Sequence, residues 1–276
     1  MSISLTAGSE RFGPATDLVR SAWRFRRVLK ATSLIELHQR YAGSLLGSIW
    51  ILLYPLLFLS IYLFLYLVIF QMRFPGYSQL NFVVFVFSGL VPYLVVMETV
   101  TRGTQIIKEN IHLIKNVIMP VELVPLRLVI VGFVGQTASF GLLVTLALVD
   151  GDMSWRVIFF PIVLLLLAMM VLGVVYYVAS LGALFNDVGY ITNLLIIALL
   201  FVSPIAFKPE MVPVHLRIIV YANPVSYPLE AIRWSLLNSY TTDPIKLVLF
   251  PVISVWVYTS GTRFFRRFKG LMADNV

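Results

Sequence analysis

The feature that most constrains the fold of this sequence is an uncharged, mostly apolar run of 26 residues at positions 45–70. About 20 apolar residues in a helix already cross the hydrocarbon core of a bilayer. Five further apolar runs follow, at residues 82–100, 123–149, 157–184, 191–207 and roughly 245–260. The sequence therefore predicts six transmembrane helices. Five helices with one re-entrant segment is the alternative, because the last two runs are short.

Composition points to the same class of protein. Hydrophobic residues make up 59% of the chain and charged residues 12%, whereas about 25% of the residues in a soluble domain are charged. We therefore expect an all-α integral membrane protein. Its net charge of +8 is explained by topology and by contact with anionic membrane lipids, and we expect no nucleic-acid partner.

Lysine and arginine are distributed unevenly along the chain. Fourteen lie in residues 1–44, in residues 101–122 or after residue 260, and five lie in the three alternating segments. The positive-inside rule places the first set in the cytoplasm, with both termini. We expect a cytoplasmic N-terminal region over residues 1–44, a transmembrane domain over residues 45–262 and a basic cytoplasmic tail over residues 263–276.

Residues 17–32 have the pattern of an amphipathic helix. Their apolar side chains share one helical face, and Arg20, Arg24 and Arg27 lie on the opposite face. This pattern predicts an interfacial helix on the cytoplasmic leaflet, with its arginines towards the lipid headgroups. The alternative is a basic lead-in that only sets the topology.

Residues 102–118 form a second amphipathic pattern, in which isoleucines recur at helical spacing. The other face carries Lys108, Glu109, His112 and Lys115. A short helix with a mixed-charge face is suited to docking a partner protein. A connector resting on the membrane has the same periodicity, so both interpretations stay open.

The segment 208–243 is expected on the external side. It contains four prolines between apolar pieces, so it is too broken for one span and too apolar for a free loop. Short re-entrant helices shielded by protein would satisfy its backbone, and external helices are the alternative. Glu230 and Arg233, three residues apart, are predicted to form a structural ion pair.

The first apolar run carries an aromatic side chain on every fourth residue: Tyr54, Phe58, Tyr62, Tyr66 and Phe70. Steps of four drift by about 40° around a helix, so the rings form a slowly winding ribbon. Such a ribbon suits a path for a molecule with apolar faces and hydroxyl groups, as in a sugar chain. Tyr62 and Tyr66 are the preferred channel residues, ahead of Phe58 and Tyr54. Ordinary helix packing is the alternative.

Catalytic patterns are missing from the sequence. It contains no G-x-x-x-x-G-K-[ST] phosphate loop, no G-x-S-x-G and no H-E-x-x-H. The chain has no cysteine, and its three histidines lack metal-ligand spacing. We therefore expect no enzymatic activity and no metal site. Asp150 and Asp152 are interpreted as part of a solvated turn.

Five motifs occur in an order typical of one transporter family. They are RYAGSLLGSIWILLYP (40–55), FSGLVPY (87–93), IIKENIHLIKNVIMP (106–120), FNDVGYITNLLIIALLFVSPIAF (185–207) and NPVSYPLEAIR (223–233). Together they resemble the ABC-2 type permeases that export O-antigen, group 2 capsule or teichoic acid. The resemblance runs from about Arg20 to Arg267. Asn186 departs from it, because the family pattern has a basic residue before the aspartate.

The resemblance implies a homodimeric permease of the inner membrane that works with two copies of a separate ATPase subunit. ATP and Mg²⁺ would bind to that partner, so no cofactor is expected in this chain. The cytoplasmic coupling helix at 102–118 and Asp187 in the turn 185–189 would contact the ATPase. The implied substrate is a lipid-linked glycan such as O-antigen; capsule, teichoic acid, and a drug or lipid cargo are alternatives.

Overall fold

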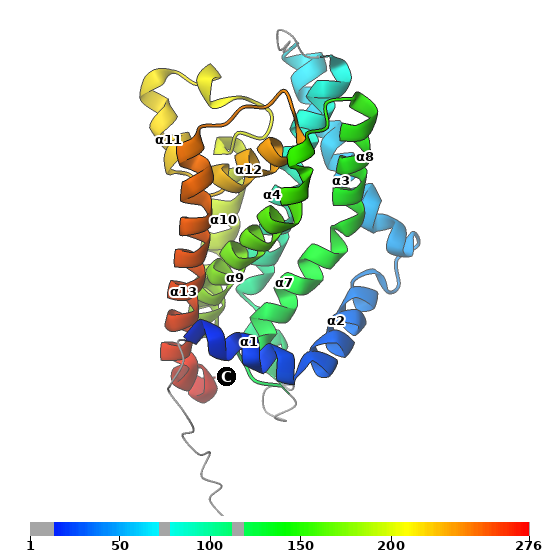
Figure 1. Ribbon diagram of the computed structural model, residues 1–276. Helices are drawn as coiled ribbons and strands as arrows, with labels where there is room; N and C mark the ends of the chain where they lie inside the picture. The colour runs from blue at the N-terminus through cyan, green and yellow to red at the C-terminus, as the bar shows by residue number, and fades with distance from the viewer. Residues whose placement is uncertain (1–13, 72–77, 112–118, 276) are drawn as a thin grey trace, which may run out of the picture.

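The computed structural model describes residues 14–71, 78–111 and 119–275 (Figure 1). These residues form helices joined by turns, which confirms the predicted all-α class. The α-helices are α1 Pro14–Arg24, α2 Arg26–Tyr41, α3 Trp50–Leu63, α4 Gln79–Gly103, α5 Ile106–Glu109, α7 Leu123–Gly135, α8 Thr137–Asp150, α9 Phe160–Leu184, α10 Asp187–Val202, α11 Arg217–Ala222, α12 Ser226–Leu236 and α13 Pro244–Asn275. Shorter 3-10 turns are η1 Gly47–Ile49, η3 Trp155–Phe159, η4 Pro209–Met211 and η5 Val214–Leu216, and η2 Phe64–Ile69 is a π-helix.

Within the described residues, five helical segments are long and apolar enough to cross a membrane. They are Gly47–Ile69, Gln79–Gly103, Leu123–Asp150, Trp155–Leu184 and Pro244–Gly270. These segments correspond to the first four predicted runs and the last one. The fifth predicted run, 191–207, contains only the shorter apolar helix α10.

Helix α10 ends at Val202 because a proline follows two residues later. Ser203 has an extended backbone, with ψ of 140°, as expected for a residue before proline. The apolar residues Ile205 and Ala206 beyond it are buried in the core. Their hydrophobicity therefore reflects burial within the protein rather than a longer helix.

Helix α4 is the centre of the bundle. Ser78 and Asn81 form a capping box at its start, with two backbone-to-side-chain hydrogen bonds of 3.0 Å. Buried residues make up 78% of its apolar window, against 11% for the first span. It packs against α3, α7, α8, α9, α10 and α12. The third span is interrupted at Gln136, where α7 ends and α8 begins.

Helices α9 and α13 approach closely through two glycines. A Cβ added to Gly173 would overlap the Val257 carbonyl, and one added to Gly261 would overlap the Gly173 carbonyl. Small residues at such crossings let helix backbones touch. This contact joins the fourth span to the C-terminal span along the side of the bundle (Figure 1).

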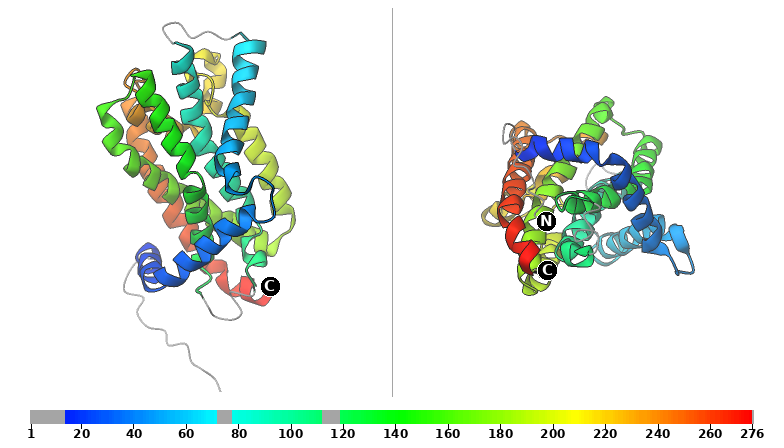
Figure 2. Two further views of the ribbon diagram at one scale, coloured as in Figure 1. Left: turned by 90° about the vertical axis from the view of Figure 1, so that its right-hand side faces the viewer. Right: turned by 90° about the horizontal axis from the view of Figure 1, so that it is seen from below.

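The N-terminal amphipathic segment is helical, but it consists of two helices. Helices α1 and α2 meet at Phe25 and run across one end of the bundle (Figure 2). Leu18 and Leu29 are buried against the bundle, whereas Arg24 and Arg27 are exposed. The start of α1 and the end of α13 lie at this same end.

The segment 208–243 lies at the opposite end of the molecule (Figure 1). Helix α11 is largely exposed there, with Ile218 70% exposed. Helix α12 is buried between α4, α9 and α13. Asn223 fixes its start: the side-chain oxygen accepts from the Val225 amide at 2.9 Å, and the side-chain nitrogen donates to Ser203 Oγ at 2.8 Å.

The two acidic residues of the turn after α8 have specific partners. Asp150 accepts a hydrogen bond from Asn81. Asp152 accepts from the backbone amide of Ser239 at 2.9 Å, and also from the hydroxyl of Ser239. The turn is therefore joined to the start of α4 and to the segment after α12.

Candidate functional site

The five aromatic side chains of the first span form an unbroken series of ring contacts, which we call the ring ladder. Successive centroids, from Tyr54 to Phe70, are 5.8, 6.2, 5.9 and 5.8 Å apart. The planes of Tyr62 and Tyr66 differ by 17°, so these two rings stack. The two end rings are exposed, and the three middle rings are partly buried against the core.

The helix changes type along the ring ladder. Residues Phe64–Ile69 are π-helical, and the Phe70 amide donates to the Leu65 carbonyl at 2.9 Å. A π-helix has more than four residues per turn, so a step of four falls short of a full turn, whereas in an α-helix it overshoots. The drift expected from a uniform α-helix is therefore reversed near the end of the span. π-Turns are rare and often occur at functional sites.

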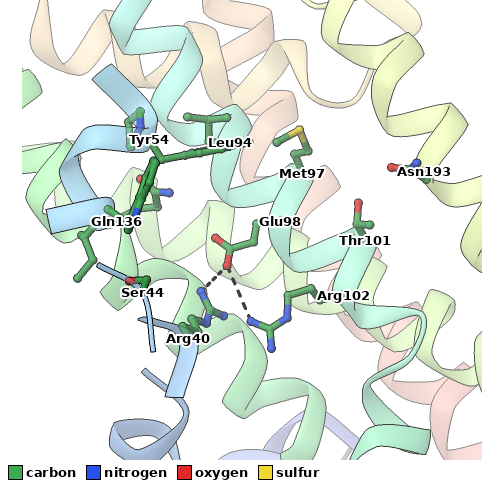
Figure 3. A pocket seen from close by; sticks show the side chains of 13 residues that line it. Arg40, Ser44, Tyr54, Leu94, Met97, Glu98, Thr101, Arg102, Gln136 and Asn193 are labelled. Carbon is green, nitrogen blue, oxygen red and sulfur yellow. Dashed lines mark hydrogen bonds and ion pairs between the residues drawn. The ribbon is translucent and has the colours of Figure 1, made fainter. Parts of the chain in front are cut away.

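A cavity of about 550 Å³ lies beside the first ring of the ladder (Figure 3). Tyr54 and Trp50 line it from the first span, and Leu94 and Met97 line it from α4. Its polar lining comes from five different parts of the chain: Arg40, Ser44, Glu98, Thr101, Arg102, Gln136 and Asn193. The wall thus combines aromatic rings with groups that donate and accept hydrogen bonds.

Glu98 of α4 lies between two arginines in this cavity (Figure 3). Arg40 at the end of α2 donates to Glu98, and Arg102 Nη1 lies 3.9 Å from Glu98 Oε1. Arg102 also lies 3.4 Å from Glu36, and Arg127 Nε lies 3.0 Å from Glu36. The side chains of Arg40 and Arg127 are only 8% and 6% exposed. The attraction between paired charges offsets the cost of removing them from water. The cluster also joins α2 to α4 and α7.

The predicted contact residues for a partner protein occupy two adjacent segments. Lys108 of α5 donates to the side chain of Asn186 at 2.6 Å, immediately before Asp187 at the start of α10. Glu109 ends α5, so the predicted continuous helix over 102–118 is divided: α4 reaches Gly103 and α5 is a separate short helix. His112 and Lys115 lie outside the described residues.

Asn186, the position that departs from the family pattern, accepts the hydrogen bond of a lysine. A basic residue there would place two positive charges together. The amide therefore suits the presence of Lys108 on the neighbouring segment. Nearby, α9 approaches the end of α4 at Gly182, where an added Cβ would overlap the Thr104 carbonyl.

Glu230 and Arg233, predicted to form a structural ion pair, each engage further groups in the structure. Glu230 is 3% exposed and binds Lys246 at 2.7 Å and the Thr242 hydroxyl at 2.6 Å. The side chain of Arg233 is fully buried and donates to the carbonyls of Pro204 at 2.7 Å and Ile205 at 2.5 Å. The buried carbonyls after α10 thus receive a donor from Arg233, and the ion pair between Glu230 and Arg233 stays a prediction.

Further contacts of Arg233 involve α4. Its guanidinium lies 3.8 Å from the centroid of the Phe85 ring and donates to the Phe85 carbonyl at 3.3 Å. An added Cβ at Gly89 would lie 2.7 Å from Arg233 Nη2, so only glycine leaves room for the guanidinium. Burial raises the pKa of the nearby Tyr240 phenol to about 12, and the charge of Arg233 opposes this rise.

Neither the cavity nor the charge cluster was predicted from the sequence. None of Arg40, Glu98, Arg127 and Gln136 was among the site residues predicted from the sequence. Their partners lie far apart in the chain, which hides the pairing. A usable signal was present, because Gln136 is an amide within an otherwise apolar span, and such polar residues often have a function.

A family model described as ABC-2 type transporter matches residues 28–237. The chain belongs to the ABC-2 type transporter family. The matched region of the transporter includes the ring ladder, the cavity and the charge cluster. The five long apolar helical segments found in the described ranges accord with an inner-membrane protein.

Several relatives of the transporter carry functional names. It is 29% identical to the O-antigen export system permease protein RfbA of Myxococcus xanthus over 69% of this chain and 72% of the relative. Identity to the RfbA permease of Klebsiella pneumoniae is 25%, over 87% and 91% of the two chains. Identity to the polysialic acid transport protein KpsM of Escherichia coli is 22%, over 87% and 94%. The alignments thus extend over most of each chain.

Proposed function

We propose that this chain is the transmembrane permease subunit of an ATP-driven exporter that moves a lipid-linked, O-antigen-like polysaccharide outwards across the inner membrane. The observation that carries the proposal is the ring ladder, which continues from a polar cavity along the first span. Relatives named for O-antigen export and for polysialic acid transport support it.

The ring ladder has the chemistry that a moving glycan needs. Aromatic faces meet the C–H groups of sugars, and the hydroxyls of Tyr62 and Tyr66 offer hydrogen bonds. Each contact is shallow, and the contacts repeat along the span at about 6 Å. Conduction requires binding that is strong enough to admit the substrate and weak enough to release it.

The proposed assembly is a homodimer with two copies of a separate ATPase, which would bind ATP and Mg²⁺. Each permease would contribute six spans, with α10 as the fifth, because its 16 residues reach about 24 Å at 1.5 Å per residue. Both termini would be cytoplasmic. Helix α5 and the turn before α10 would form the ATPase contact, supported by the hydrogen bond between Lys108 and Asn186.

The external segment completes the proposed architecture. Helix α12, buried among spans, would be a re-entrant helix near the outer mouth of the channel. Its backbone is shielded by α4, α9 and α13, as non-helical or broken backbone at membrane depth requires. Its fixed position depends on Arg233 and on the ion pair between Glu230 and Lys246.

Deletion of the gene, with complementation by the intact chain or by a Tyr62→Ala/Tyr66→Ala variant, tests the function. We expect the deletion to abolish a surface polysaccharide and the double variant to reduce it strongly. Membrane level and dimerisation should be unchanged. The matched control is Phe64→Ala, which removes an exposed ring of the same span outside the ladder. Polysaccharide extracted from the cell surface is the readout.

Unchanged surface polysaccharide in the deletion strain would contradict the proposal. A changed drug resistance or lipid composition in that strain would support a different cargo for the same architecture. Sugar analysis of the lost polymer separates O-antigen from capsule and teichoic acid. The proposed ATPase partner is tested by purifying the permease. An ATPase should purify with it, and the ATP turnover of that ATPase should rise when the permease is present.

A further inference from the structure

The cavity beside Tyr54 is more than an opening at the end of the ring ladder. We propose, on the basis of the proposed function, that it is a binding site for a sugar unit of the glycan. Its volume of about 550 Å³ is within the range of small-molecule sites, about 300–1,000 Å³. One water molecule takes up about 30 Å³ in the liquid. The cavity is therefore much larger than is needed to hydrate one polar side chain.

Two uncharged polar side chains in the wall each have a buried oxygen atom that has no hydrogen-bond partner among the described residues. Gln136 is 7% exposed, and its Oε1 atom is buried without a hydrogen bond among the described residues. Thr101 Oγ1 is also buried without a partner in this part of the chain. Buried polar atoms in proteins are nearly always paired. Two exceptions on one cavity therefore indicate a bound group that both donates and accepts, as a sugar hydroxyl does.

The position of Gln136 has a structural cause. It occupies the break between α7 and α8, with φ of −96° and ψ of 4°, so the side chain leaves the third span where that span is not a continuous helix. An amide placed inside a span is costly unless it binds a partner. The break presents this amide beside the aromatic wall of Trp50 and Tyr54.

The charged groups favour a sugar over a phosphate. Arg40 donates to Glu98, and Arg102 lies within 3.9 Å of Glu98 and 3.4 Å of Glu36. Both guanidinium groups of the lining are thus already paired with carboxylates. Among the uncharged polar groups of the lining, the buried atoms without a hydrogen bond in the described part of the chain belong to an amide and a hydroxyl, which match uncharged hydroxyl groups. The rings of Trp50 and Tyr54 supply the flat apolar surface that a sugar face requires.

The cavity and the ring ladder share a residue. Tyr54 lines the cavity, and its ring lies 5.8 Å from that of Phe58, the next ring of the ladder. A glycan held in the cavity would therefore meet the ladder without crossing a gap. The cavity lies nearer the end of the bundle that holds α1 and α2, and it would be the first sugar site on the proposed path.

The test is photochemical capture in cells that make the polysaccharide. A p-benzoylphenylalanine replaces Asn193, an exposed residue that lines the cavity, or Leu195, which is 58% exposed and outside the lining. Leu195 lies about 200° further round α10. After irradiation the permease is purified under denaturing conditions and probed with antibody to the polysaccharide. We expect a glycan adduct from position 193 and none from position 195.

A third variant carries p-benzoylphenylalanine in place of Tyr62. A glycan adduct from position 62 together with none from position 193 would overturn the cavity site and leave the proposed function standing. An adduct at 193 that contains lipid phosphate but no sugar would also overturn it. Failure of the proposed function itself is recognised separately, by unchanged surface polysaccharide in the deletion strain.

Mutation of Gln136 provides a second measurement. We expect Gln136→Leu to lower surface polysaccharide at least fivefold and the control Thr137→Val to leave it unchanged. Normal export by the Gln136→Leu variant would contradict the site.

Discussion

Replacement of Arg233 by alanine should destabilise the transporter more than any other single loss of charge. The guanidinium makes two short hydrogen bonds, to the carbonyls of Pro204 and Ile205, and lies against Phe85. Hydrogen bonds from a charged group contribute about 1.5–3 kcal/mol each, so the two bonds give about 3–6 kcal/mol before the cavity left by the side chain is counted. Replacement by lysine keeps the charge but loses the fork geometry, and its effect should be intermediate.

The assay is thermal unfolding of the purified permease in detergent, followed by the loss of the monodisperse peak in size-exclusion chromatography. We expect the melting temperature of Arg233→Ala to fall by several degrees, with a smaller fall for Arg233→Lys. Arg267→Ala, which removes an exposed arginine of α13, is the matched control and should melt like the wild type. Equal melting temperatures for Arg233→Ala and Arg267→Ala would refute the assigned role of these hydrogen bonds.

Three further predictions concern other contacts. Gly173→Leu should separate α9 from α13, because its side chain would overlap the Val257 carbonyl, and thermal unfolding should show a loss of several kcal/mol. Lys108→Glu should weaken the contact with Asn186 and lower stimulation of the ATPase in reconstituted vesicles. Its melting temperature should stay within a few degrees of the wild type, and full stimulation would contradict the docking role. Lys269→Ala should cost under about 1 kcal/mol, because its ion pair with Glu122, at 2.7 Å, involves an exposed lysine and such pairs contribute little; a larger loss of stability would show that the tail packs more firmly than its exposure indicates.

The membrane-spanning helices were predictable because hydrocarbon thickness sets their length. The first four runs and the last run each became a long apolar helix. The run at 191–207 was predicted less well because its residues after Val202 are apolar for another reason. Ile205 and Ala206 are buried around Arg233, and hydropathy does not distinguish burial in protein from burial in lipid.

The candidate site was predictable only where it follows from local spacing. The ring ladder repeats every four residues, so it is visible in the sequence, and its ring contacts follow from helical geometry. The pairing of Arg40 with Glu98 joins residues 58 positions apart, and no periodicity encodes such a distance. The ion pair between Glu230 and Lys246 was not visible in the sequence for the same reason, since Lys246 lies on the next helix.

The π-helical turn at Phe64–Ile69 has a consequence for how the family diverges. A wider turn accommodates a residue that an α-helical turn does not, and it lies after Tyr62 in the ring ladder. Loss of one residue here would restore α-helical spacing and rotate Phe70 by about 100°, without altering Tyr54 or Phe58. Insertions and deletions of single residues should therefore be tolerated in this part of the first span and selected against nearer the cavity. The length of this turn would then distinguish lineages whose ring ladders differ near Phe70 while the end beside the cavity stays the same.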